Sequence, residues 1–449
     1  MRAALLAIAL LSASVAHAEP RPPPKRPAPS FDGRARPPAT AGDVALATAR
    51  AILFPIRIVV DYGVRWPLGK LISAAEHSRG VRRVLRYLFL QPPTPTMSIT
   101  PIAFYDFGFQ SSIGLRLSWK DGFLTPGSKF SLKLGTGGAD WWRGDGTVVV
   151  AVPRTHGFRA GFDASVRRRP DQQFFGLGPR TPQSARARYL SARFGATAHA
   201  GWRELAFLVG STSTFTAASH FHDSASIDDQ VAAGRIAALP AGYGALVETQ
   251  HFGARISLDS RGAKDSPERE RDTSGARLDG IVERVRARGL GHWSHVDATL
   301  GAALRLDPPG EHKLDLRLRL ELVEPSAARD GADIPFLELA TIGGSRDLRG
   351  FANGRGRGLS AAAVTLDYQW PLAAWLDATL YLGAGNAFGR RLSGLTAGKL
   401  RGSAGMGLAL AGLTNERQLE LWAAVGTDPF DEGAELRSFR LVLGYSHDY

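Results

Sequence analysis

Few residues in this chain could bind a metal ion by their type and spacing. His220, His222 and Asp223 resemble part of a zinc-ligand cluster, because alternate histidines can converge on one metal ion. No further set of ligands and no general base stands beside them, and the neighbouring residues are those of a polar loop. We therefore predict that the protein holds no metal ion and no cofactor.

Local catalytic signatures are also missing from the sequence. It contains no G-x-S-x-G nucleophile elbow, no P-loop and no H-E-x-x-H motif. Gly383, Gly385 and Gly389 do not have the spacing of a dinucleotide-binding loop and do not open a helix. A serine, a histidine and an acid dispersed over separate strands would leave no local motif, and this alternative stays open. The prediction is that the protein is not an enzyme.

The most unusual stretch is rich in glycine and arginine and covers residues 341–360, referred to as the Gly/Arg loop. It is too rich in glycine for a helix and too charged to cross lipid. Alternating glycine and arginine at residues 354–358 would suggest RNA binding in a cytosolic protein. Between two segments that read as membrane strands, it instead predicts a loop that folds into a polar interior and pairs its charges there. The central residues of the loop are Leu348, Arg349, Gly350 and Phe351.

The N-terminal residues predict export. Arg2, an apolar run over residues 3–15 and the sequence Ala16-His17-Ala18 have the three parts of a secretory signal peptide, residues 1–18. No later apolar run reaches the roughly 18 residues that a membrane-spanning helix needs. The absence of cysteine excludes disulfide bonds and thiolate metal sites.

Charge indicates what kind of partner the chain meets. The formal net charge is +13, and the arginines mostly alternate with apolar residues rather than forming a block. An exported chain with this pattern is not expected to bind nucleic acid. The expected partners of the basic side chains are the phosphates of outer-membrane lipid, including anionic lipopolysaccharide, or acids inside the protein.

Two segments precede the remainder of the chain. Residues 19–40 are dominated by proline, arginine and alanine, which predicts an extended or disordered linker. Residues 41–96 have apolar residues at helical spacing, with arginines on the opposite face. This periplasmic helical segment could lie on an anionic membrane surface, dock on the rim of a barrel, or pack as an ordinary helix.

From about residue 98 the apolar pattern changes to period two. Over residues 313–322, leucines at every second position alternate with lysine, aspartate, arginine and glutamate. Such alternation fits strands with lipid outside and a polar lumen inside. Eleven segments of this kind precede the Gly/Arg loop and five follow it, which predicts an all-β fold: a 16-stranded antiparallel transmembrane β-barrel over residues 97–449, with a short N-terminal helical segment.

Polar insertions and tryptophans predict further features of this barrel. Polar insertions at residues 220–229 and 261–274 have the character of extracellular loops. Tryptophans near predicted strand ends are expected to form interfacial girdles. They are Trp141, Trp142, Trp293, Trp370, Trp375 and Trp422.

Four motifs resemble those of the bacterial surface antigen family, the barrel superfamily that contains outer-membrane protein insertases and two-partner-secretion transporters. The Gly/Arg loop resembles the family's long-loop signature. The other three motifs, in the family's order along the chain, are Phe174-Phe175-Gly176-Leu177-Gly178, Asp367-Tyr368-Gln369-Trp370-Pro371-Leu372 and Tyr381-Leu382-Gly383-Ala384-Gly385-Asn386-Ala387-Phe388. The family's receptor modules, the POTRA domains, need a longer segment than residues 19–100 and an alternating βα pattern that these residues do not have. We therefore expect a member that lacks them.

The resemblance implies roles for named residues. The loop arginine, here Arg349, would pair with one acid on each of the two strands after the loop. Asp367 matches the first acid, but Gly383 stands at the position of the second. A one-acid latch is therefore expected, with Asp347 or Glu321 as auxiliary acids.

The resemblance also implies a function in the bacterial outer membrane: assembly or translocation of client membrane or secreted proteins by a barrel that opens where its first and last strands meet. The last strand would contribute Phe439, Leu441, Leu443 and Tyr445, opposite residues 99–107. The alternative is a passive pore or surface antigen without insertase activity. The expected oligomeric state is a monomer.

Overall fold

The structure is a computed structural model. It describes residues 97–120, 124–153, 155, 157–261, 274–306, 312–326, 331, 333–345, 347–373, 376–411 and 418–445. The predicted signal peptide, linker and periplasmic helical segment, residues 1–96, lie outside the described residues, as does Trp375.

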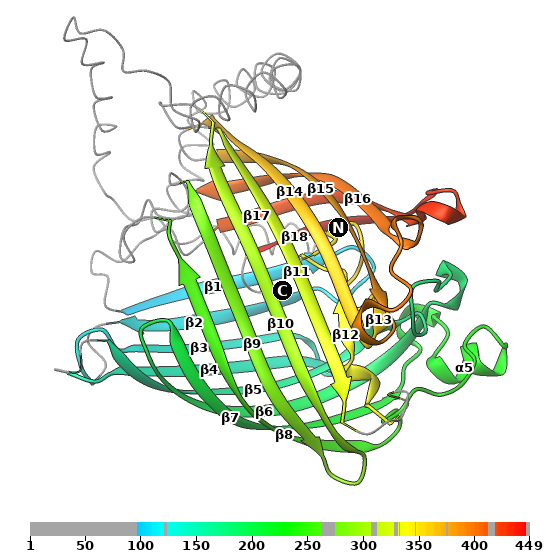
Figure 1. Cartoon of the computed structure of the whole chain (residues 1–449), viewed down its shortest axis with the longest axis horizontal. Helices are drawn as coiled ribbons and strands as arrows, with labels where there is room; N and C mark the ends of the chain where they lie inside the picture. Colours follow the sequence, from blue (N-terminus) through cyan, green and yellow to red (C-terminus); the bar gives the residue numbers. More distant parts are fainter. Residues whose placement is uncertain are drawn as a thin grey trace, which may run out of the picture.

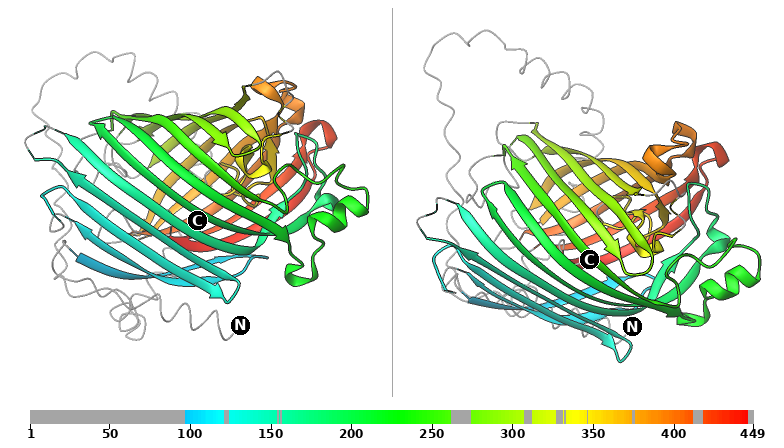
Figure 2. Two further views of the ribbon diagram at one scale, coloured as in Figure 1. Left: turned by 90° about the horizontal axis from the view of Figure 1, so that it is seen from below. Right: turned by 60° about the horizontal axis from the view of Figure 1, so that its bottom comes forward.

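Sixteen antiparallel strands close into one barrel, in which each strand pairs with its neighbours along the chain and the last pairs with the first (Figure 1). The wall strands are β1 (Met97–Asp106), β2 (Ser112–Lys120), β3 (Lys129–Gly138), β4 (Trp141–Ala151), β5 (Phe158–Phe174), β6 (Ala187–Trp202), β7 (Leu205–Ala218), β8 (Leu246–Asp259), β9 (Gly275–Ala287), β10 (Gly291–Arg305), β11 (Lys313–Pro325), β14 (Ser360–Ala373), β15 (Leu376–Phe388), β16 (Arg401–Ala411), β17 (Gln418–Pro429) and β18 (Leu436–Tyr445). Figure 2 shows these strands running obliquely around the wall. The predicted fold class and strand number are confirmed.

Alternation along each strand separates an apolar outer face from a polar inner face. In β11, Leu316 and Leu318 are exposed on the outside, whereas Arg319 and Glu321 face the lumen. Large apolar side chains are exposed around the wall because a strand directs successive side chains to opposite faces. Examples are Leu115, Leu134, Phe162, Phe194, Phe207, Phe252, Leu382 and Phe439. This is the distribution that a lipid-facing barrel requires.

The predicted tryptophan girdle is wrong for three residues. Trp141, Trp293 and Trp422 are buried on the luminal side, each with at most 8% of its surface exposed. Trp370 lies on the outer face of β14, because it has the same parity as Leu366, the cross-strand partner of the outward-facing Leu316. Trp142 faces outward and is 39% exposed. A tryptophan's position near a strand end predicts its depth in the membrane. Whether it points outward or into the lumen depends on whether it occupies an odd or an even position along the strand, which the strand register fixes.

The connections at the two ends of the barrel differ in length. The end that carries the Gly/Arg loop also carries the β7–β8 connection, in which α5 (Ile227–Ala232) lies at the rim (Figure 1). Within the described residues no helix is long and apolar enough to cross a membrane. Most of the second polar insertion, residues 262–273, lies outside the described residues. The strands that flank it, β8 and β9, follow one another at the end opposite to the β7–β8 connection, so the prediction that both insertions are extracellular is wrong. Composition indicates a polar connection, whereas the end at which it lies follows from strand direction.

Candidate functional site

The Gly/Arg loop lies against the inner wall, where Figure 2 shows it in yellow within the ring of strands. Its ends pair with each other as β12 (Ala340–Ile342) and β13 (Gly356–Gly358). Gly350 fastens its centre, because its N–H donates to Ser403 Oγ at 2.9 Å and its carbonyl accepts from Ser438 Oγ at 2.8 Å. A side chain at Gly350 would clash with the Val425 carbonyl group. Strands β16, β17 and β18 therefore all contact this one glycine.

Leu348 and Phe351 anchor the same turn of the loop by apolar contact. They are 0% and 2% exposed and belong to the main buried cluster of the protein. Because both side chains are fully removed from water, their packing favours the docked loop by roughly 1.5–3 kcal/mol each.

Arg349 lies between these apolar anchors and binds Asp367 on β14. Its guanidinium donates to both carboxylate oxygens, with 2.9 Å between Nη2 and Oδ2. Burial alone would lower the pKa of Arg349, but the Asp367 carboxylate outweighs it, so the pKa is raised. A bidentate arginine–carboxylate pair is among the stronger polar contacts available to a protein.

Aromatic rings occupy the place where the motif pattern predicts a second acid. The guanidinium carbon of Arg349 lies 4.5 Å from the Tyr381 ring centroid and 4.1 Å from that of Trp422. Tyr381 Oη also accepts from the Arg349 backbone N–H at 3.2 Å and donates to the Asp347 carbonyl at 2.7 Å. A side chain at Gly383 would clash with this hydroxyl group. Cation–π contacts thus accompany the single ion pair.

The two acids expected to assist Arg349 bind a different arginine. Asp347 and Glu321 pair with Arg319, at 2.7 and 2.8 Å, and Arg319 also reaches Asp297 at 3.2 Å. Sequence reasoning missed Arg319 because it is one of several alternating charges in β11. One signal could have identified Arg319: it lies on a strand between two strands that carry acids, Asp297 on β10 and Asp367 on β14.

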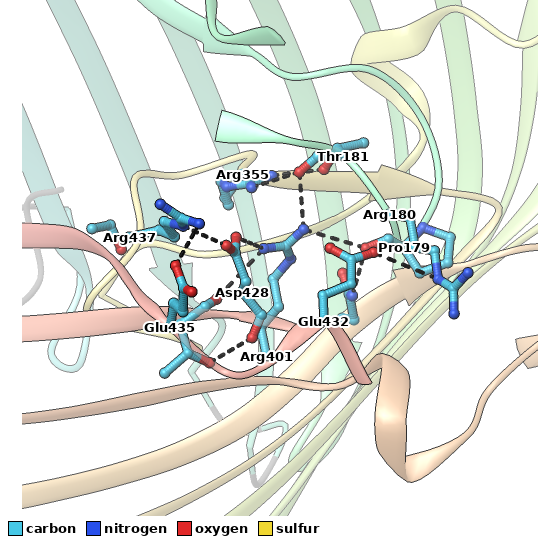
Figure 3. A network of polar contacts seen from close by, with 12 residues as sticks. Pro179, Arg180, Thr181, Arg355, Arg401, Asp428, Glu432, Glu435 and Arg437 are labelled. Atoms are coloured by element: carbon cyan, nitrogen blue, oxygen red, sulfur yellow. Dashed lines mark hydrogen bonds and ion pairs between the residues drawn. The ribbon is translucent and has the colours of Figure 1, made fainter. Parts of the chain in front are cut away.

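The family-like motifs converge on the loop. Arg355 stacks over the Phe175 ring at 4.3 Å and donates to the Thr181 carbonyl at 2.7 Å. Arg401 donates to the same carbonyl at 2.9 Å. Asn386 donates to the Pro179 carbonyl at 2.9 Å. These residues come from the β5–β6 connection, the Gly/Arg loop, β15 and β16, and thus fasten the loop to the barrel rim (Figure 3).

The rim network pairs arginines with acids, but Arg355 also has a second arginine, Arg401, beside it. Arg401 and Arg437 both approach Asp428, at 3.5 and 2.6 Å, as Figure 3 shows. Burial, reinforced by the charge of Arg401, lowers the pKa of Arg355 to about 9. The guanidinium of Arg355 is therefore held by a carbonyl, a hydroxyl group and a ring.

Among the described residues, which end at Tyr445, the first and last strands are joined by two register pairs. Tyr105 pairs with Leu443, and Asp106 with Val442, which are the two register pairs described between β1 and β18. By comparison, eight pairs join β1 to β2 and nine join β17 to β18. The Leu441 carbonyl accepts one further bond from Phe107 N. Of the other predicted seam residues, Phe439 pairs with Val425, and Tyr445 with Leu419, both on β17.

A buried ion pair closes this seam, referred to as the β1–β18 seam. Arg440 donates to both carboxylate oxygens of Asp106, at 2.7–3.1 Å, and these side chains are 7% and 4% exposed. Arg440 Nη1 also lies 3.4 Å from the Phe351 carbonyl oxygen. The seam and the Gly/Arg loop are thus in direct contact.

The histidine cluster in the β7–β8 connection does not assemble a metal site. His220 Nε2 lies 3.1 Å from Asp229 Oδ2, and His222 stacks on Phe221. The Ser226 backbone N–H and hydroxyl group hold the pKa of the Asp229 carboxyl below its usual value. Across the described ranges, no three or more candidate ligand residues gather where they could hold a metal ion.

No protein-family model and no curated protein matches the chain. Among solved structures, BamA from Haemophilus ducreyi lacking POTRA domains 1-3 superposes with a TM-score of 0.50 at 15% identity, over 78% of this chain and 70% of that chain. This protein has the barrel fold of BamA. The motif-based resemblance is thereby confirmed for the fold, and the apolar outer wall is that of a transmembrane β-barrel.

Two weaker similarities complete the comparison. CdiB from Acinetobacter baumannii has a TM-score of 0.46 at 12% identity, over 80% of this chain and 61% of that chain. OprD from Pseudomonas aeruginosa has a TM-score of 0.32 at 14% identity, over 78% of this chain and 94% of that chain.

Proposed function

We propose that the barrel assembles or translocates client membrane or secreted proteins by opening at the β1–β18 seam. The observation that carries this proposal is the pairing at the seam: among the described residues, which end at Tyr445, two pairs join β1 to β18, whereas nine join β17 to β18. A strand edge with few partners offers backbone N–H and C=O groups to another strand. A client strand could add to this edge by β-augmentation.

The Gly/Arg loop would regulate this opening. It contacts β18 through Ser438 and Arg440, and it is held on β14 by the Arg349–Asp367 pair. Release of the loop would remove the contact between Arg440 and the Phe351 carbonyl and weaken the seam. Docking of the loop and closure of the seam are therefore coupled in this proposal.

A disulfide across the seam tests the proposal. The chain has no cysteine, so Tyr105→Cys with Leu443→Cys introduces one defined pair at facing positions. The oxidised protein in liposomes should lose its acceleration of client-barrel folding, and reduction should restore it. The control pair is Leu366→Cys with Leu382→Cys, which bridges β14 and β15 away from the seam. Equal client folding with the seam oxidised and reduced would reject the opening mechanism.

The second candidate is a passive pore or surface antigen. A polar lumen that contains a cavity supports it, because water and small solutes could occupy such a space. Planar-bilayer recording separates the two candidates. Large, stable openings that persist with the seam oxidised would favour the pore, whereas small fluctuating currents abolished by oxidation would favour the insertase.

Membrane lipid is the other proposed partner. The exposed apolar side chains would contact acyl chains, and basic residues at the rim would approach the phosphates of anionic lipopolysaccharide.

A further inference from the structure

A cavity of about 230 Å³ lies in the lumen between the Gly/Arg loop and the wall, where β1, β2, β4, β5, β11 and β18 line it. Its lining is rich in guanidinium groups. The charged residues around it are Arg143, Arg167, Arg169, Arg319, Arg440, Asp106 and Asp347. Five bases and two acids thus face one space.

Some of these arginines are fully occupied by protein acids. Arg440 is bound by Asp106, and Arg319 by three carboxylates. Arg169 forms two hydrogen bonds to Asp171 at 2.9 Å. These residues shape the cavity, but their charge is already balanced.

Arg167 is balanced less well. Arg143 on β4 is the cross-strand partner of Arg167 on β5, which is in turn the partner of Arg193 on β6. Three arginines therefore stand side by side on one inward-facing row. Like charges at directly opposite positions destabilise a sheet.

The nearby acids leave Arg167 the least well paired of the cavity arginines. Arg143 forms an ion pair with Asp145, and Arg167 reaches the same carboxylate only at 4.0 Å. Arg193 lies 3.8 Å from Glu338. Within the described residues, Arg167 therefore has no carboxylate of its own.

Of the arginines that line the cavity, Arg167 has the fewest polar contacts within the described residues. Within the described residues its guanidinium makes no hydrogen bond, and its side chain is 45% exposed although it points into the lumen. It presents several unused donors to the cavity.

We propose that this cavity binds a small, soluble oxyanion of the phosphate class, with Arg167 and Arg143 as its principal ligands. Guanidinium groups bind phosphate oxygens in a bidentate manner, and a multiply charged anion relieves the repulsion along the row. A volume of about 230 Å³ holds roughly seven or eight water molecules, which is enough for phosphate or diphosphate but not for a large solute. The ligand is a soluble one because the barrel wall separates the cavity from lipid.

The test is calorimetric titration of the full-length, detergent-folded protein with sodium diphosphate, compared with Arg167→Gln. The substitution should weaken binding about tenfold or more, since it removes charge-assisted hydrogen bonds. Arg168→Gln is the matched control, because Arg168 is the neighbouring residue on the outer face, beside Asp140. Arg167→Lys retains the charge without the bidentate geometry and should give an intermediate affinity.

Heat-modifiable gel mobility establishes that each variant is folded before titration. Absence of diphosphate binding by the folded wild-type protein, or equal binding by Arg167→Gln and Arg168→Gln, would overturn the assignment. Citrate tests the ligand class: binding as tight as diphosphate, and equally dependent on Arg167, would replace the phosphate assignment with a carboxylate one. Failure of the seam experiment would leave this result unaffected.

Discussion

Replacing Arg349 by alanine should undock the Gly/Arg loop while leaving the barrel wall closed. The substitution leaves the Asp367 carboxylate 4% exposed without its cation, a situation that typically destabilises by about 3–5 kcal/mol. It also removes the stacking on Tyr381 and Trp422. At about 1.4 kcal/mol for each factor of ten, the population of undocked loop should rise between about a hundredfold and a few thousandfold.

Trypsin measures this population directly. Arg355 and Arg357 are 2% and 7% exposed in the docked loop, so cleavage there requires opening. When reclosing is faster than cleavage, the cleavage rate follows the open population and should rise by the same factor. Arg317→Ala is the control, because Arg317 lies on the same face of β11 as Arg319 but forms no ion pair within the described residues. A cleavage rate within threefold of wild type, with unchanged heat-modifiable mobility, would refute the assignment of Arg349 as the main anchor.

Two further substitutions test the neighbouring contacts. Gly383→Asp introduces the acid that the family-like pattern would have at this position. It should lower the folded yield on a heat-modifiability gel, because the new side chain meets the Tyr381 hydroxyl group. Combining it with Tyr381→Ala should restore the yield, and a well-folded single variant would contradict this packing argument. Asp106→Asn should lower the unfolding temperature of the barrel and increase current fluctuations in bilayers, because it leaves the buried Arg440 without a carboxylate across the β1–β18 seam. The exposed pair Arg288–Glu248 is the control, since Glu248→Gln should change neither quantity measurably.

Local patterns were sufficient to predict most of the wall. The alternation of leucine with charged residues in β11 has a period of two, which only a strand converts into two distinct faces. The same argument applied to each segment predicted sixteen strands and the place of the Gly/Arg loop between the eleventh and the twelfth. The two short strands inside that loop were not predicted, because three-residue segments rich in glycine have no periodic signal.

The choice of partners inside the lumen could not be predicted in the same way. Asp347 lies two residues before Arg349 in the sequence, yet it binds Arg319 on the wall. The pairing of Arg440 with Asp106 joins residues 334 positions apart. Trp141 and Trp142 are adjacent, and one is buried while the other faces outward.

The sequence by itself therefore determined the β-barrel, its strand number, its apolar outer face and a glycine-rich loop carrying Arg349. These features depend on short-range periodicity and composition. Only the tertiary structure decided that Tyr381 and Trp422 flank Arg349 and that Arg319 binds three acids. It also decided that three arginines share one row, of which Arg143 and Arg167 line a cavity. Those contacts depend on the register of neighbouring strands and on closure of the barrel, which bring together residues that no local pattern relates.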